Sequence, residues 1–268
     1  MDFSAPTSQA ALVRDKFDAR ASDYTTWYEG ETLGAGAFRR RRELTLEVLR
    51  NLPPGKVLDV GCGPGVLVSG LLEQGHEVWG VDFAPAMIEQ CRAAFEHESR
   101  AHFAVGAIEA LDFDDDSFDA ITCLGVVEYL DDDRAALREL HRVLRPGGLA
   151  VITCPHYWAP WRRWDALYWR LVQPLRSLLG RAPYSLVSHR EYRESAYRAL
   201  LAEQGFFVED VAYYGFGLVP TPLDRKLPRL HASIGRCLDS QARGPLQKLG
   251  MGFNITVRKG PPTKGLPK

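Results

Sequence analysis

The sequence predicts an α/β fold in which a parallel sheet is flanked by helices. Between residues 56 and 154, short apolar runs alternate with longer segments whose apolar residues recur every three or four positions. This alternation is typical of β-α-β units. The first apolar run enters the stretch KVLDVGCGPGVLVSG, where three glycines stand between a strand and a helix. Such a turn gives the backbone room for a nucleotide-like ligand.

Five strands of the parallel sheet follow from the apolar runs. They are expected at Lys56–Val60, Glu77–Val81, Ala101–Val105, Phe118–Leu124 and Leu149–Cys154. The helical segments between them stop at glycine or before proline, as helices commonly do. Two later runs, FFVEDVAYY and MGFNITVRK, are expected to close the sheet, and the alternation in NITVR is typical of an edge or antiparallel strand.

The composition is that of an ordinary globular protein with room for one large domain. Of the 268 residues, 46% are hydrophobic, and the formal net charge is −1. A chain so close to neutral has no overall attraction for nucleic acid, so we expect no such partner. The four arginines of FRRRRELTLEVL are interpreted as the solvated start of a helix outside the sheet.

Cysteine usage and the lack of long apolar runs predict a cytoplasmic protein. The five cysteines are scattered and form no C-x-x-C pair, which favours free thiols in a reducing compartment. The sequence does not begin like a secretory leader, and no apolar run approaches the roughly 20 residues of a membrane span. Residues 259–268, rich in proline, glycine and lysine, are expected to be a frayed tail.

The glycine turn differs chemically from a dinucleotide-binding turn. Its glycines are Gly61, Gly63 and Gly65, but Val66 stands where G-x-G-x-x-G has its third glycine. Asp59 lies two residues before the first glycine. A carboxylate there suits a ligand that carries a positive amine or sulfonium rather than a second pair of phosphates.

A second acidic residue ends the next strand. In VWGVDFAPAMI, Asp82 stands where a carboxylate can accept hydrogen bonds from both hydroxyls of a ribose. Phe83 and Met87 beside it offer apolar faces for an adenine. The glycine turn and Asp82 together favour a nucleoside ligand over a merely structural turn.

Four motifs extend this pattern along the chain: VLDVGCGPG, GVDFAPAMIEQCR, VGAIEALDFDDDSFDAITCLGVVEYLDD and LRELHRVLRPGGLAVITCPH. In order and spacing they resemble class I S-adenosylmethionine-dependent methyltransferases, most closely the ubiquinone/menaquinone-biosynthesis type. The resemblance covers about residues 12–155 closely and 187–258 more loosely. It implies a doubly wound, Rossmann-like sheet of seven strands with the last strand antiparallel, and S-adenosyl-L-methionine bound at the carboxyl ends of strands one to four.

The resemblance also implies which residues hold the cofactor. The glycine turn and Cys62 would wrap the methionine part, with Asp59 near its amine. Asp82 would hold the ribose, while Leu124 and Gly125 would lie under the methionine chain. The full implied set is Tyr24, Asp59, Gly61, Cys62, Gly63, Gly65, Asp82, Phe83, Met87, Ala107, Ile108, Leu124 and Gly125.

Two parts of this set depart from the family pattern or have an alternative. Relatives often carry an aspartate where this chain has Ala107, so contact with the adenine there would rest on backbone groups of Ala107 and Ile108. The segment VRDKFDARASDYTTWYEG resembles one that folds over the cofactor, with Tyr24, and either Tyr28 or Trp27, closing on the sulfonium. The alternative is that these aromatic residues only pin the segment onto the core.

Methyl transfer needs alignment and exclusion of water, and it needs a base only where the acceptor carries a proton. Candidate bases are His156 and His189, and Glu128 and Tyr129 are candidates for orienting the substrate; a packing or surface role is the alternative for each histidine. In quinone-type O-methyltransferases a Glu-His pair and an upstream acid can hold a metal. Here Glu128 matches the glutamate, but Tyr129 and Gly125 replace the other two, so we expect no metal.

A tryptophan-rich insertion follows the fifth strand, and it is expected to form an amphipathic helix. One face of the helical wheel carries Trp161, Trp164, Tyr168, Leu171, Val172, Leu175, Leu178 and Leu179, and the other carries Arg162, Arg163, Arg170, Gln173 and Arg176. Three interpretations remain: a lid over a greasy substrate, peripheral contact of residues 157–180 with anionic lipid, or packing on the domain. Pro174 is expected to kink this helix or to divide it.

The expected organisation has five parts. They are an N-terminal helical cap (1–50), the cofactor-binding core (51–155), a helical lid insertion (156–187), a C-terminal part of the core (188–258) with a second insertion (215–250), and the tail. Because both insertions are rich in apolar residues, we predict a methyltransferase for a hydrophobic small molecule, such as a lipid, a quinone precursor, or a phenolic or polyketide-like natural product. O-methylation is favoured because histidines are available as bases.

Two alternatives to this function stay open. One is N- or C-methylation of a more polar natural product. The other is a cofactor-binding protein without catalysis that docks on a membrane or a partner.

Overall fold

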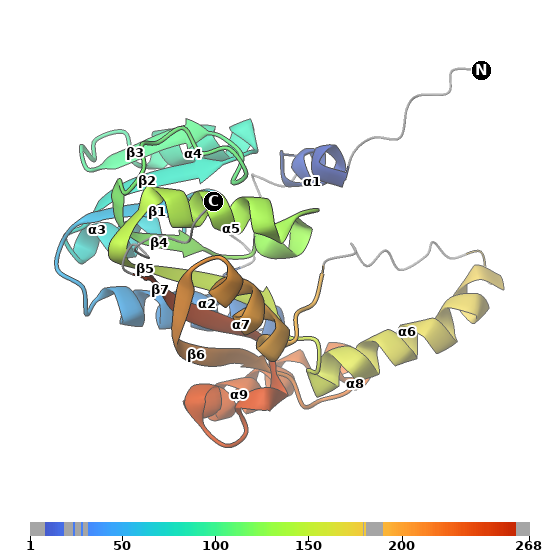
Figure 1. Cartoon of the computed structure of the whole chain (residues 1–268). Helices are drawn as coiled ribbons and strands as arrows, with labels where there is room; N and C mark the ends of the chain where they lie inside the picture. Colours follow the sequence, from blue (N-terminus) through green and yellow to red (C-terminus); the bar gives the residue numbers. More distant parts are fainter. Residues whose placement is uncertain are drawn as a thin grey trace.

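A seven-stranded mixed sheet forms the centre of the molecule (Figure 1). The computed structural model describes residues 9–18, 24, 28, 32–178, 180 and 190–260. The strands are β1 (Lys56–Val60), β2 (Glu77–Asp82), β3 (Ala101–Val105), β4 (Phe118–Cys123), β5 (Leu144–Pro155), β6 (Phe206–Phe216) and β7 (Gly250–Lys259). Their order is β3-β2-β1-β4-β5-β7-β6. Strands β1 to β5 pair in parallel and β7 is antiparallel to β5 and β6, which confirms the predicted fold class.

Two strands differ in detail from expectation. Strand β7 lies inside the sheet, so of the two alternatives for NITVR the antiparallel one is correct and the edge belongs to β6. Most of β7 is buried, so the alternation in its sequence does not mark a water-facing side. Strand β5 begins at Leu144 rather than at Leu149, because Leu144 already pairs with Phe118 of β4.

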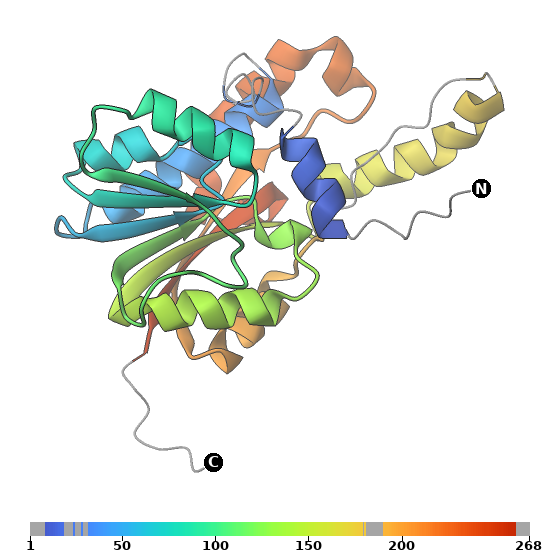
Figure 2. The ribbon, with the colours of Figure 1, turned by 90° about the horizontal axis from the view of Figure 1, so that it is seen from above.

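Helices cover both faces of the sheet (Figure 2). Their bounds are α1 (Gln9–Asp18), α2 (Leu33–Leu49), α3 (Val68–Glu73), α4 (Pro85–Ala94), α5 (Asp133–Val143), α6 (Pro160–Leu178), α7 (Glu194–Glu203), α8 (Leu223–Lys226) and α9 (Pro228–Leu238). Short 3-10 helices span Val127–Tyr129 (η2), Asp239–Arg243 (η3) and Gln247–Leu249 (η4).

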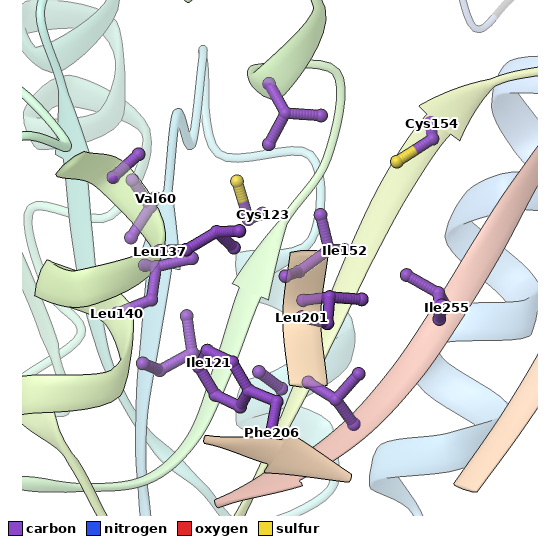
Figure 3. Packing of buried hydrophobic residues seen from close by; sticks show 14 of the residues in the cluster. Val60, Ile121, Cys123, Leu137, Leu140, Ile152, Cys154, Leu201, Phe206 and Ile255 are labelled. Atoms are coloured by element: carbon purple, nitrogen blue, oxygen red, sulfur yellow. The ribbon is translucent and has the colours of Figure 1, made fainter. Parts of the chain in front are cut away.

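The two faces of the sheet bury separate sets of side chains. Leu58 and Ile121 pack with residues of α5 and α7, such as Leu201 (Figure 3). Their strand neighbours Val57 and Ala120 point the other way and pack with α2 and α3. Strands buried on both faces explain why the central runs are almost continuously apolar.

Two insertions extend from the carboxyl half of the sheet. Helix α6 runs without interruption through Pro174 and projects away from the body, so it is not divided into two short helices (Figures 1 and 2). The second insertion, between β6 and β7, contains α8 and α9. The Trp161 indole donates to the Val219 carbonyl (3.0 Å) and the Trp164 indole to the Thr221 carbonyl (2.8 Å). These bonds fasten the base of α6 to the second insertion.

The structure also bears on the expected membrane spans, cysteines and C-terminal tail. No helix within the described ranges is both long and apolar enough to cross a membrane. The five cysteines are free, and only Cys237 is exposed. The predicted tail begins too early, because Lys259 still belongs to β7. Residues 261–268 lie outside the described residues. The division of the chain into cap, core and insertions stays a prediction.

Candidate active site

A cavity lies at the carboxyl ends of β1, β2 and β4, where parallel α/β sheets commonly bind ligands. Predicted cofactor residues that line it are Tyr24, Gly61, Gly63, Asp82, Phe83, Met87, Ala107, Ile108, Leu124 and Gly125. The rest of its wall comes from Val13, Phe17, Val60, Gly106, Glu109, Val126, Tyr129, Leu130 and Asp131. Segments from residue 13 to residue 131 therefore converge on one site.

The glycine turn fits a ligand because side chains there would occupy its space. Gly61 has a φ of 69°, and a Cβ on it would collide with Val126. The Gly61 N–H donates to the Val81 carbonyl (2.7 Å), which fixes the turn against β2. A Cβ on Gly63 would lie 3.5 Å from the Tyr24 ring. Only glycine combines this backbone conformation with an open floor to the cavity.

Asp82 at the end of β2 is held as a hydrogen-bond acceptor. Its Oδ2 accepts from the Gly63 N–H and its Oδ1 from the Ala84 N–H, both at 2.9 Å. Each carboxylate oxygen has a second lone pair. Burial raises the pKa of Asp82, and the two N–H donors oppose that shift. The carboxyl group can therefore accept hydrogen bonds from two hydroxyls, as a ribose presents.

Aromatic side chains form the apolar wall of the cavity. The Phe17 ring lies 5.4 Å from Tyr129, 6.2 Å from Tyr24 and 6.4 Å from Phe83, measured between ring centroids. Burial raises the pKa of the Tyr24 phenol, so this ring stays neutral. Met87 is fully buried beside Tyr24. This wall suits a flat apolar base and presents ring faces to a cation.

Three predicted cofactor residues lie beneath the cavity rather than on its surface. Asp59 is buried in β1, where its Oδ1 accepts from the Thr122 hydroxyl (2.6 Å), and burial raises the pKa of Asp59 to about 7. Cys62 is buried beside Cys91. A Cβ on Gly65 would meet the Phe95 ring at 2.8 Å. These three residues pack inside the protein and do not line the cavity.

Arg41 lies next to the cavity residue Gly125 without lining the cavity itself, and the sequence interpretation of its segment as solvated is wrong. Its side chain is only 6% exposed, its Nη2 donates to the Tyr28 hydroxyl (3.2 Å), and its Nε has no hydrogen-bond partner in the described part of the chain. Its Nη1 lies 2.8 Å from the point that a Cβ on Gly125 would occupy. Because a buried guanidinium is costly without an anion, this position suits a ligand carboxylate.

The neighbouring arginines also donate hydrogen bonds to backbone carbonyls of the protein. Arg39 donates to the Tyr28 carbonyl and Arg42 to the Val66 carbonyl, both at 2.6 Å. The helix face gives a signal that could have found Arg41, since it follows Ala37 by four residues and precedes Leu44 by three, and both are buried. The four-arginine run hides this spacing.

The two histidine candidates differ in what the structure shows. His156 is buried, its Nδ1 lies 3.0 Å from the Gly250 carbonyl, and its ring packs edge-on against Tyr213 and Phe253. Burial lowers the pKa of His156, and the residue does not line the cavity. These contacts describe a packing histidine. His189 lies outside the described residues.

Glu128 and Tyr129 follow β4 on η2 and differ in environment. Tyr129 lines the cavity, and burial raises its pKa to about 12. The Oε2 of Glu128 is buried and has no hydrogen-bond partner among the described residues. Burial raises the pKa of Glu128, while the charges of Arg41 and Arg162 oppose that shift. Glu128, like His156, does not line the cavity, but it directly precedes Tyr129, which does, and its buried Oε2 is left without a partner in the described part of the chain.

No group of three histidine, cysteine, aspartate or glutamate side chains suited to a metal ion occurs in the part of the chain that the structure describes. The expectation that the protein holds no metal stays a prediction.

Comparison with known proteins agrees with a cofactor-binding site of this geometry. Residues 58–152 match the model of a methyltransferase domain. A demethylmenaquinone methyltransferase of Beutenbergia cavernae is 30% identical over 237 residues, with 84% of this chain and 95% of that protein covered. A ubiquinone biosynthesis O-methyltransferase of Alkalilimnicola ehrlichii is 34% identical over 143 residues, which cover 52% of this chain and 57% of that protein.

A solved structure has the same fold. The 1,6-didemethyltoxoflavin-N1-methyltransferase of Burkholderia thailandensis, determined with S-adenosylhomocysteine, has a TM-score of 0.59 at 21% identity and covers 97% of this chain and 93% of that one. Because the glycine turn, Asp82 and the aromatic wall fit an adenosine with a cationic amino-acid tail, the match extends to the cofactor. The chain therefore belongs to the class I S-adenosylmethionine-dependent methyltransferases of the ubiquinone/menaquinone-biosynthesis type, and S-adenosyl-L-methionine is its cofactor.

Proposed function

We propose that this chain O-methylates a hydrophobic small molecule that carries an ionisable hydroxyl group, such as a phenol or a quinone precursor. The buried carboxyl of Glu128, next in sequence to the cavity residue Tyr129, carries the proposal, because its Oε2 has no hydrogen-bond partner among the described residues. The relatives named for ubiquinone biosynthesis and demethylmenaquinone add support for this acceptor class. Glu128 thus takes the role first considered for His156, which is packed against Tyr213.

Each of the site residues has a separate role in the proposed reaction. Asp82 would hold the ribose, the glycine turn the methionine part, and Arg41 its carboxylate. Bound there, the cofactor would supply a methyl group on a sulfonium: the sulfur–methyl bond breaks, its electron pair stays on sulfur, and a neutral thioether is the leaving group. The acceptor oxygen forms the new bond to carbon, and Glu128 takes the proton that this oxygen loses. Tyr129 and Phe17 exclude water from the reacting side.

The apolar character of the acceptor rests on the two insertions. They flank the end of the sheet beyond β5, on the side where an acceptor would approach the cavity, and they carry most of the exposed apolar side chains of the described chain. A small polar acceptor would not need such surroundings. A hydrophobic acceptor partitions into membranes, so the proposal includes a cytoplasmic enzyme with peripheral membrane contact through residues 157–180.

Transfer of label from methyl-labelled cofactor tests the proposal. The protein is incubated with labelled cofactor and a cell extract, and the products are divided between organic and aqueous phases. Label in the organic phase that is released by cleavage of a methyl ether supports the proposal. Label only in water-soluble products, or on nitrogen or carbon, refutes it. No label above a control without the protein indicates a binding protein without catalysis.

A further inference from the structure

Most of the exposed large apolar side chains belong to two segments, 158–178 and 218–230. They are Trp158, Trp164, Leu167, Leu171, Leu175, Leu178, Leu218, Leu223, Leu227 and Leu230. Single exposed apolar residues are normal on a protein surface, but a cluster of this size on two adjoining segments marks an interaction surface. We call these ten side chains the insertion surface.

The part of this surface on α6 forms a row. Leu167, Leu171 and Leu178 are spaced by four and seven residues, so they share one helical face, and Trp164 and Leu175 flank them. Leu171 is 69% exposed and Leu178 is 84% exposed. Helix α6, which carries this row, projects away from the sheet and its covering helices (Figures 1 and 2).

The second segment is fastened to the base of α6. Thr221 donates from its hydroxyl to Asp165 Oδ1 (2.7 Å), in addition to the indole bonds from Trp161 and Trp164. Leu218 and Leu223 lie on either side of Thr221 in the sequence, and both are about half exposed. The two segments therefore adjoin at the root of the helix.

The exposed charges on these segments are all basic in their described side chains. Arg170, Lys226 and Arg229 are exposed, whereas Asp165 is buried and Asp224 is half-buried, where it accepts from Thr221. An apolar row with basic residues beside it is complementary to a lipid bilayer, whose acyl chains are apolar and whose headgroup layer can be anionic. A protruding helix, unlike a groove, can lie in the plane of such a boundary.

We propose that the insertion surface binds the interface of a bilayer that contains anionic lipids. The leucines and Trp164 enter the boundary between headgroups and acyl chains, and Arg170, Lys226 and Arg229 lie against the headgroup phosphates. The contact is interfacial, since the described chain has no helix able to span a membrane. This inference rests on the membrane contact included in the proposed function and adds to it the side chains and the lipid charge, and flotation tests it separately from methyl transfer.

Vesicle flotation of the full-length protein tests the surface. Vesicles of phosphatidylcholine alone are compared with vesicles of equal parts phosphatidylcholine and phosphatidylglycerol. The protein is expected to float with the anionic vesicles, and raised salt is expected to weaken this binding. The Leu171→Glu/Leu178→Glu variant should bind at least about tenfold more weakly. Leu246→Glu, at a leucine 45% exposed outside the insertion surface, should bind like the wild type.

Two controls keep the outcomes distinct. Each variant is checked for its thermal midpoint and for binding of S-adenosylhomocysteine, both of which should match the wild type because Leu171 and Leu178 are far from the core. No flotation of the wild type, or equal loss in Leu246→Glu, overturns the proposal. A lipid-free dimer that Leu171→Glu/Leu178→Glu converts to a monomer also overturns it, because the surface is then a self-association face.

Discussion

The half of the sheet that holds the cofactor differs from the half beyond β5 in how its site is built. Around β1, β2 and β4, short motifs place each group: a glycine turn, a carboxylate at a strand end, and an aromatic residue beside it. Beyond β5, the base of α6 meets the second insertion only because distant segments fold together, and Arg162 on α6 lies close enough to Glu128 for its charge to oppose the rise in the pKa of that carboxyl. In the first half, each motif is a short stretch of sequence that serves one cofactor. In the second half, the contacts join residues far apart in the sequence, and these residues can differ between enzymes with different acceptors.

This difference predicts that variants in the first half weaken cofactor binding, while variants in the second half change turnover or localisation and leave cofactor binding intact. The expected effects below run from the largest to the smallest.

Gly61→Ala should reduce affinity for S-adenosylhomocysteine at least about 100-fold, because an added Cβ collides with Val126 and must adopt a positive φ. Isothermal titration calorimetry measures the affinity. Gly147→Ala is the matched control, since Gly147 also has a positive φ but nothing lies within 4 Å of its added Cβ. It should cost about 1 kcal/mol of unfolding free energy and leave affinity unchanged. Equal affinity losses in both variants would show that strain, not the cavity floor, is responsible.

Glu128→Gln should lower the rate of label transfer about 100-fold, as expected for loss of a general base. Affinity for S-adenosylhomocysteine should stay within about twofold of the wild type, because Glu128 does not line the cavity. The wild-type rate should rise with pH through a pKa above that of an ordinary glutamate, since burial raises the pKa and the base acts when deprotonated. The rate of the Glu128→Gln variant should lack this rise with pH. Glu203→Gln, on the outer face of α7, is the control, and a normal rate in Glu128→Gln would exclude the base.

Arg41→Met should weaken affinity for S-adenosylhomocysteine about tenfold, as expected when an arginine loses a charged hydrogen-bond partner on the ligand. Thermal stability should be unchanged or higher, because the variant removes a buried cation that forms no ion pair with the described residues. Calorimetry and thermal unfolding measure the two effects. Arg40→Met, which removes the ion pairs to Glu43 and Glu47, should leave affinity unchanged. Lower stability with unchanged affinity in Arg41→Met would make Arg41 structural.

Asp59→Asn should change the pH dependence of stability by a small amount. Asp59 has a pKa of about 7 in the folded protein against an ordinary value of 3.8. Between these values the folded state holds more protons than the unfolded state, so this group's contribution to stability falls as pH rises. The variant keeps an acceptor for Thr122 and lacks this slope. Urea unfolding below and above this window should show the variant gaining stability relative to wild type at the higher pH; a constant difference would contradict the shift.

The same contrast explains what the sequence could predict. The five parallel strands and the cavity residues Gly61, Gly63, Asp82, Phe83 and Met87 follow from local patterns, since an apolar run ending in glycines or an aspartate needs no distant partner to be recognised. The other predicted cofactor residues on the cavity wall follow only from the family resemblance: Tyr24, Ala107, Ile108, Leu124 and Gly125. Arg41 was missed because its role depends on Gly125 and Tyr28, which lie far from it in sequence. His156 looked suitable from its place after β5, but its packing against Tyr213 and Phe253 arises from β6 and β7.

The tryptophan insertion shows the same limit on a larger scale. Periodicity predicted an amphipathic helix, and α6 is one. Which residues face solvent depended on the second insertion, because its Val219 and Thr221 carbonyls hold the indoles of Trp161 and Trp164. The leucines farther along the helix are exposed. Helical periodicity gives the faces, and only the tertiary contacts decide which face is covered.

Titration of S-adenosylhomocysteine into the wild type and Asp82→Ala tests the central claim most directly. The account predicts micromolar binding to the wild type and a loss of about 100-fold in the variant, because two hydrogen bonds to a carboxylate are removed. Exposed Asp114→Ala is the matched control and should bind like the wild type. Unchanged affinity in Asp82→Ala, with the fold intact, would contradict the assignment of this cavity to the cofactor.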